Sequence, residues 1–344
     1  GIILSIKYKV PIITAWSAPG TALLVALFPH ISLNEVVAAY ITSAVIIFFI
    51  GVTGSFDKLL KWIPQGVAAG MMAGILFQFG VGLFKATDSM PYVVFGMLAC
   101  FLLAKRFSPR YAIIWVLLSG ITLSFLFGKI NPVPMNFSLA IPELIMPEWT
   151  WSSTLNLAIP LTIVSLTGQF LPGMAILKLS GYNTPAKPIL SVASIVSLAV
   201  AITGGITIVL AAITAALCTG KDSHELKEKR YIAGIANGIF YILGGLFAGS
   251  IVMLFSILPK ELVAALAGLA LLGAIATNIS VAMKDESQRD AALITFLATV
   301  SGMHFLGFSS VFWGICIGMI SHLVLSKREE KINTPPSTQN SVQS

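Results

Sequence analysis

Two short polar interruptions inside apolar segments have residue types that could bind an anion. The first runs from Thr14 to Thr21 inside the apolar stretch 11–28. Ser17 is a good helix N-cap, and Pro19 fits a first helical turn because its missing N–H would be unpaired there anyway. We therefore expect a half-helix whose free N–H groups and positive dipole end face the break, an arrangement that suits an anion.

The second interruption is Thr203–Thr207, which contains the adjacent glycines Gly204 and Gly205. Adjacent glycines weaken a helix and free its backbone locally. We expect Thr203 or Thr207 to cap a following helix that runs from Ile208 to Leu217. Two half-helix N-termini would then meet near the middle of a membrane.

The composition of the chain shows what surrounds these breaks. Hydrophobic residues make up 56% of the chain and charged residues 10%, against about 25% charged residues in soluble domains, and the mean hydropathy is +0.91. The sequence therefore predicts a polytopic protein of the lipid bilayer. Hydrocarbon tolerates an interrupted helix only where it is buried in protein or lines a cavity, so both breaks point to a site.

Other ligands are not expected from the composition. The net charge of +7 is read as a topology signal, so we expect no nucleic acid as a partner. The three cysteines lie in apolar runs without paired spacing, which predicts no disulfide, no metal site and no cofactor.

About twelve apolar segments divide the chain, and several are shorter than the roughly 20 residues of a straight membrane helix. They cover residues 11–28, 34–54, 64–84, 91–104, 111–127, 151–172, 186–204, 205–219, 231–257, 260–283, 290–303 and 305–325.

The positive charges predict the orientation. If the chain crosses at every segment, all of the 21 Lys and Arg residues except Lys85, Lys129 and Lys260 fall on one side, which is the cytoplasmic side by the positive-inside rule. The C-terminus is then cytoplasmic, and residues 327–344 form a disordered tail. The two broken segments run in opposite directions, as inverted repeats would. Gly1–Ile6 is mostly apolar and follows no initiator Met, so we expect the chain to begin inside a span.

Several motifs make the family recognisable. They are Val10-Pro11 followed by Thr14–Gly20, Pro172–Ala175 with Gly181-Tyr182, Ala211–Ala216, Arg289–Ala292 and Phe312–Gly314. The chain resembles the benzoate/proton symporter family, BenE, over nearly its whole length.

That resemblance implies a fold and a function. The family is similar to the uracil-permease and sulfate-transporter architecture, an all-α fold of 7+7 spans in two inverted repeats, of which the first two spans would be missing here. It implies a core domain at residues 1–54 and 151–257 and a gate domain at 55–150 and 258–326. The expected activity is uptake of benzoate or a similar aromatic carboxylate with protons across the bacterial cytoplasmic (inner) membrane by alternating access. A homodimer is a candidate assembly, and the sequence does not decide the oligomeric state.

An aromatic carboxylate needs an apolar slot for its ring and donors for its charge. We expect Trp16 and Phe170 to form the slot, while the half-helix N-termini and nearby hydroxyls supply the donors. Gln169 is the one amide deep in the segment 151–172, and polar groups there are costly unless they function. The candidate substrate-binding residues are therefore Thr14, Trp16, Ser17, Pro19, Gly20, Thr21, Gln169, Phe170, Gly204, Gly205 and Thr207.

The sequence offers no carboxylate at the middle of a span for proton coupling, because every Asp and Glu lies in a joint, a tail or a segment end. The remaining candidates are the carboxyl group of the substrate, Glu35, His304, or a part that precedes residue 1. A carrier of another small anion or a nucleobase is the alternative on the same fold. An enzyme is not expected because the spans hold no clustered acid, base, nucleophile or metal set, and a channel is disfavoured because no filter motif is present.

Overall fold

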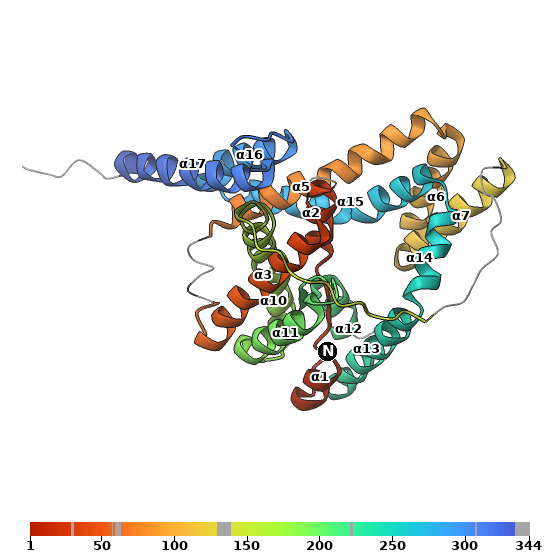
Figure 1. Ribbon diagram of the computed structural model, residues 1–344, viewed down its shortest axis with the longest axis horizontal. Coiled ribbons are helices and arrows are strands. Elements are labelled where there is room, and N and C mark those ends of the chain that lie inside the picture. The colour runs from red at the N-terminus through yellow and green to blue at the C-terminus, as the bar shows by residue number, and fades with distance from the viewer. Residues whose placement is uncertain are drawn as a thin grey trace, which may run out of the picture.

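The computed structural model describes residues 1–28, 31–56, 58, 63–128, 139–220, 223–306 and 308–333 (Figure 1). The described part is mostly helical, with one small sheet of two strands. Up to residue 128 the elements are α1 (Ile2–Tyr8), β1 (Thr14–Trp16), α2 (Ala18–Leu27), α3 (Leu33–Thr53), α5 (Gln65–Lys85), η1 (Ala86–Asp88), α6 (Pro91–Phe107), η2 (Pro109–Tyr111) and α7 (Ala112–Leu126).

The part after residue 138 begins with an extended segment and then a long helix with two π-helical turns. Its elements are α8 (Trp151–Ser153), η3 (Thr154–Ala158), α9 (Ile159–Ser165), η4 (Leu166–Phe170), α10 (Leu171–Leu179), α11 (Ala186–Ala201), β2 (Ile208–Leu210), α12 (Ala212–Thr219), η5 (Lys227–Lys229), α13 (Tyr231–Leu246), α14 (Ala248–Ile257), α15 (Lys260–Lys284), α16 (Glu286–Val300) and α17 (Ser310–Asn333). The turns η3 and η4 are π-helical.

Local sequence accounts for several helix ends. Ser32 accepts a hydrogen bond from the backbone of Glu35, and the Glu35 side chain accepts one from Ser32 N, so α3 begins with a complete capping box. The same helix ends at Gly54, whose φ of 70° is left-handed, a conformation that favours glycine. Pro91 starts α6 in the first turn, where proline is tolerated.

In the described residues, five helices are long and apolar enough to cross a membrane, or up to six if one bent pair forms a single span. This supports a polytopic membrane protein, while the number of crossings stays a prediction. The segment 231–257, expected to be one span, consists of two helices, α13 and α14, bent by 69°. The bend lies at Phe247, which follows Gly244 and Gly245, and glycines allow such kinks.

The long helices pack in two groups. In one group α3 packs against α11, α10 against α12, and α1 against α13. In the other, α5 packs along α15 and α16, α16 along α17, and α6 along α7. Glycine allows the closest of these contacts, because a side chain at Gly70 of α5 would collide with the carbonyl oxygen of Ala292 on α16. We call these sets of helices the α3 group and the α5 group.

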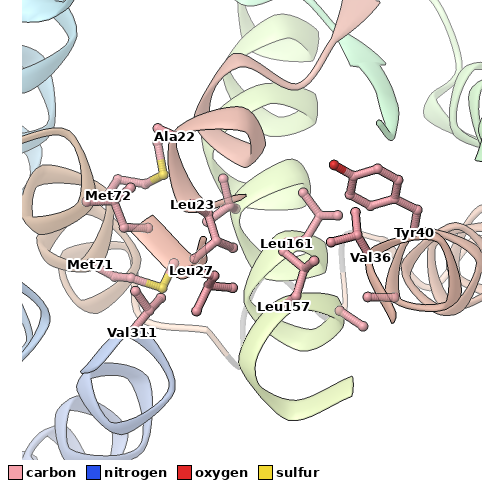
Figure 2. Packing of buried hydrophobic residues seen from close by; sticks show 14 of the residues in the cluster. Ala22, Leu23, Leu27, Val36, Tyr40, Met71, Met72, Leu157, Leu161 and Val311 are labelled. Carbon is pink, nitrogen blue, oxygen red and sulfur yellow. The ribbon is translucent and has the colours of Figure 1, made fainter. Parts of the chain in front are cut away.

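A cluster of buried apolar side chains lies where the two groups meet (Figure 2). Leu23 and Leu27 of α2 and Leu161 of α9 lie close to Met71 and Met72 of α5. Methionine is unbranched and adapts to irregular surfaces. The boundary is therefore apolar, and its two methionines can adapt to the surfaces they pack against.

The C-terminal tail differs from expectation. Residues 327–344 are predicted to be disordered, but α17 continues to Asn333. Lys, Arg and Glu dominate residues 327–331, and these residues have high helix propensity, which explains the extension. Residues 334–344 lie outside the described residues.

Candidate anion site at the crossing of two broken helices

The two predicted interruptions lie side by side. The strands β1 and β2 pair antiparallel, with Thr14 opposite Leu210 and Trp16 opposite Ile208. One further hydrogen bond at each end extends the pairing, from Ser17 N to Thr207 O at 3.0 Å and from Ala211 N to Ile13 O at 2.9 Å. Backbone N–H and C=O groups of each break are thus hydrogen-bonded to the other break, as an apolar environment requires.

The pairing also fixes the direction of the two half-helices. Each strand leads directly into a helix, β1 into α2 and β2 into α12. We call the paired strands Thr14–Trp16 and Ile208–Leu210 the crossing. Because these strands are antiparallel, α2 and α12 leave the crossing in opposite directions, and Figure 1 shows α2 above it and α12 below it. Both N-termini therefore face the crossing, as predicted.

The first N-terminus is capped as the sequence predicts. Ser17 is the N-cap of α2, its Oγ accepts a hydrogen bond from Gly20 N at 3.1 Å, and Pro19 lies in the first turn. Thr21 donates from both N and Oγ1 to the carbonyl oxygen of Ser17, so its hydroxyl is already engaged. A side chain at Gly20 would collide with Leu161 of α9, so glycine lets this turn approach α9 closely.

The second N-terminus differs from the prediction. The helix begins at Ala212 instead of Ile208, and its N-cap is Ala211, which makes no side-chain hydrogen bond. The expected caps do not reach it: Thr203 donates to Val200 O, and Thr207 precedes the strand. Pairing with β1 holds Ile208–Leu210 extended, so the helix can start only after them.

The two glycines close the preceding helix instead of opening the next one. Gly204 has a left-handed φ of 77°, and Gly205 N donates to Val200 O at 2.9 Å. This is how glycine commonly ends a helix. Thr207 is 1% exposed, and its hydroxyl has no hydrogen-bond partner among the described residues.

The missing cap gives the second N-terminus the stronger capacity for an anion. In the part of the chain that the structure describes, the N-cap residue Ala211 makes no side-chain hydrogen bond to the first-turn N–H groups of α12, from Ala212 to Thr214. Alanine at a cap position carries no chemical signal, and so sequence reasoning missed these donors. They are the groups that a helix N-terminus offers to a carboxylate.

Two residues of the long bent helix were expected at the site. Gln169 is half-buried in the π-helical turn η4, and such turns occur often at functional sites. Phe170 is 0% exposed and packs among Leu166, Leu177 and Leu210, so its ring does not line an open slot, contrary to expectation. Phe170 is the last residue of this π-helical turn, where the 100° per residue of an α-helix does not apply.

Trp16 lies on the open side of the crossing. It is 54% exposed, and its ring lies 5.2 Å from that of Tyr241 on α13, at an angle of 50°. These two rings offer an apolar surface beside β1. Tyr241 was not predicted, because only the packing of α13 brings it near.

Two buried serines on neighbouring helices hydrogen-bond to the backbone at or beside the paired strands. Ser5 of α1 donates to Ile12 O and accepts from Ile12 N, both at 3.1 Å. Ser197 of α11 accepts from Ile208 N at 2.8 Å. Neither serine was predicted to contribute, although a serine inside an apolar helix is a signal that can be read in the sequence.

The proton-coupling candidates lie elsewhere. Glu35 forms the capping box of α3 and also accepts a hydrogen bond from Thr150 Oγ1 at 2.8 Å. His304 is exposed in the connection between α16 and α17. The structure therefore brings neither residue to the crossing. Within the described residues no group of three or more His, Cys, Asp or Glu side chains could hold a metal ion.

Comparison with known proteins identifies relatives over nearly the whole chain. The family described as benzoate membrane transport protein, BenE, matches residues 1–324. The chain is 73% identical over 327 residues to the benzoate membrane transport protein of Acinetobacter baylyi, which covers 95% of this chain and 83% of that protein. It is 36% identical over 323 residues to the inner membrane protein YdcO of Escherichia coli, covering 94% of this chain and 83% of that protein.

A solved structure supports the fold. The overall structure of SLC26A9 matches with a TM-score of 0.63 and 13% sequence identity, covering 93% of this chain. The chain spans 58% of the length of that protein. At this identity the likeness concerns the fold alone, and it agrees with the expected sulfate-transporter architecture.

Proposed function

The chain belongs to the BenE family of benzoate membrane transport proteins, and from this membership and the geometry of the crossing we propose that it transports benzoate across the bacterial cytoplasmic (inner) membrane. The observation that carries the proposal is the antiparallel pairing of β1 with β2, which points two helix N-termini at one place. Helix N-termini favour a carboxylate by their free N–H groups and dipoles.

The substrate is held by complementary parts of the crossing. The carboxylate accepts hydrogen bonds from the first turn of α12, where no side chain caps the helix. The ring packs on the exposed face of Trp16 beside Tyr241. Gln169, in its π-helical turn, donates from its amide to the carboxylate.

Alternating access follows the two groups of helices. The core at residues 1–54 and 151–257 contains both half-helices and corresponds to the α3 group. The gate at 55–150 and 258–326 contains α5 and the helices packed along it. What supports this division is that each group packs mainly within itself, while an apolar cluster with two methionines lies between them. The core moves against the gate and carries the site from one side of the membrane to the other, and the C-terminus is cytoplasmic.

Protons move with the substrate in this proposal, and Glu35 does not carry them. What supports this choice is that both oxygens of Glu35 already accept hydrogen bonds, from Ser32 N and Thr150 Oγ1. A carboxylate held in this way acts as a cap and as a link to the segment before α8.

The test is uptake of labelled benzoate by the purified protein in proteoliposomes. An imposed inward proton gradient should drive accumulation, and a protonophore should abolish it. Excess unlabelled benzoate should compete, whereas uracil and sulfate should not. Uptake that ignores the gradient would refute the coupling, and uptake of labelled uracil without any benzoate uptake would favour a nucleobase carrier.

A further inference from the structure

A cavity of about 210 Å³ lies away from the crossing, between the half-helix α2 and the helices α5 and α15. Its lining residues are Ala22 and Val25 of α2, Gln78, Phe79 and Gly82 of α5, and Ala264 of α15. The cavity is smaller than the roughly 300–1,000 Å³ of sites for drug-sized ligands. Its size therefore suits a small molecule with a single ring.

The chemistry of the lining is that of a slot with one polar end. Phe79 and the three small or branched aliphatic side chains are apolar, and Gln78 supplies an amide. Gln78 is exposed and lies within a candidate membrane span, Gln65–Asp88. An amide in such a segment is costly unless it has a hydrogen-bond partner. An aromatic ring with one carboxylate matches an apolar slot that has one N–H donor.

The position along α2 separates this cavity from the crossing. Ala22 and Val25 follow the N-cap Ser17 by five and eight residues, which corresponds to about 7 and 12 Å along a helix that rises 1.5 Å per residue. A ligand that leaves the N-terminus of α2 along this helix reaches the cavity next.

The walls of the cavity come from α2, which the proposed division places in the core, and from α5 and α15, which it places in the gate. The helices α5 and α15 are in close contact, because a side chain at Gly268 of α15 would come within 2.7 Å of the carbonyl oxygen of Phe79 on α5. This part of the wall is therefore tightly packed. On the other side, Ala22 of α2 faces Met72 of α5 across the apolar cluster (Figure 2). Movement of α2 against α5 therefore changes the width of the cavity.

We propose that this cavity is a second, transit site for the aromatic carboxylate, in which the Gln78 amide donates to the carboxylate and Phe79 packs on the ring. The inference rests on the proposed benzoate transport, and it assigns Gln78 a role in substrate affinity that is separate from the crossing. The transit site takes up the substrate when the core moves and passes it to or from the half-helix N-termini.

Two substitutions test the site by different means. Gln78→Leu removes the donor, and the loss of a hydrogen bond to a charged group predicts a rise of about tenfold or more in KM for benzoate uptake. Gly82→Leu fills the cavity, and a Cβ at this position meets no atom within 4 Å, so the fold has room for it. The matched control is Gly273→Leu on α15, where a Cβ likewise meets nothing within 4 Å.

The expected result is a higher KM in Gln78→Leu and Gly82→Leu, an unchanged KM in Gly273→Leu, and unchanged melting temperatures in all three. Gln78→Asn, which keeps an amide, should recover part of the affinity. An unchanged KM in Gln78→Leu would overturn the proposal. If Gly82→Leu alone raised the KM, the proposal would also fail, and the cavity would be assigned to a lipid chain. Absence of benzoate uptake in the unmodified protein would instead overturn the proposed function and this inference with it.

Discussion

The backbone N–H of Ser17 donates to the carbonyl oxygen of Thr207 at 3.0 Å, so the two interruptions of the chain share a hydrogen bond. Ser17 is at the same time the N-cap of α2. A shift of one half-helix at the crossing is therefore passed to the backbone that precedes the other. The two half-helices are thus linked through the backbone as well as through the strand pairing.

Ser17→Ala should weaken the first N-terminus. It removes the acceptor of Gly20 N, and loss of a cap costs about 1 kcal/mol. We expect a lower melting temperature and a higher KM for benzoate, because α2 then loses its fixed position at the crossing. Ser32→Ala removes an equivalent cap from α3, away from the crossing, and should lower stability alone. Equal KM values in both variants would exclude Ser17 from the site.

Gln169→Leu should reduce benzoate affinity without unfolding the protein. Leucine has a similar volume and removes the amide from the π-helical turn η4. A lost hydrogen bond to a carboxylate predicts a KM about tenfold higher or more. Asn278→Leu is the control, since the Asn278 amide donates within its own helix to Ala274 O. If both variants transport like the unmodified protein, Gln169 serves packing alone.

Glu35→Gln should retain uptake driven by the proton gradient. Glutamine preserves the reciprocal bonds of a capping box, and Glu35 serves as that cap while it also accepts from Thr150. Proteoliposome uptake across a range of proton gradients measures the coupling directly. Accumulation that no longer depends on the gradient would identify Glu35 as the proton carrier.

The existence of the two breaks could be predicted because their signals are local. Ser17 and Pro19 are a recognisable helix start, and the glycines at 204 and 205 are a recognisable helix end. The pairing of Thr14–Trp16 with Ile208–Leu210 could not be predicted, because it joins distant parts of the chain. That pairing decides where α12 begins, and so it overrides the nearby threonines that look like better caps.

The outcome at Phe170 has a different cause. An α-helix turns about 100° per residue, and the prediction of a ring facing a slot assumes that turn throughout. One π-helical turn, η3, lies before Phe170, and Phe170 is itself the last residue of a second, η4, so the α-helical turn per residue does not hold up to this position. Nothing in the apolar sequence of this helix marks these turns, so burial of Phe170 had to come from the structure.

Ala212→Pro should remove one donor from the second N-terminus and leave the helix in place. Ala212 is the first residue of α12, a position that proline favours because its missing N–H has no helical partner. Ala211 has an extended conformation with ψ of 96°, as a residue before proline needs. We expect a higher KM for benzoate. Leu33→Pro makes the same change at the start of α3 and should leave the KM unaltered; a rise in both variants would point to a general effect of proline.

Asn156→Leu should loosen the boundary between the two groups of helices. Asn156 of η3 is 7% exposed, and its Oδ1 accepts from Ser309 N, just before α17, at 2.6 Å. Leucine leaves the Ser309 N–H without this partner, which costs about 1–3 kcal/mol when η3 and α17 are in contact. The population therefore shifts toward an arrangement in which η3 and α17 are apart. Val311 is 4% exposed beside this contact, so a cysteine placed there, in a protein whose own cysteines are replaced by serine, should react with a thiol reagent faster in Asn156→Leu. Asn156→Asp keeps an acceptor oxygen and should react slowly. Equal rates in Asn156→Leu and the unmodified background would show that this hydrogen bond does not hold the boundary closed.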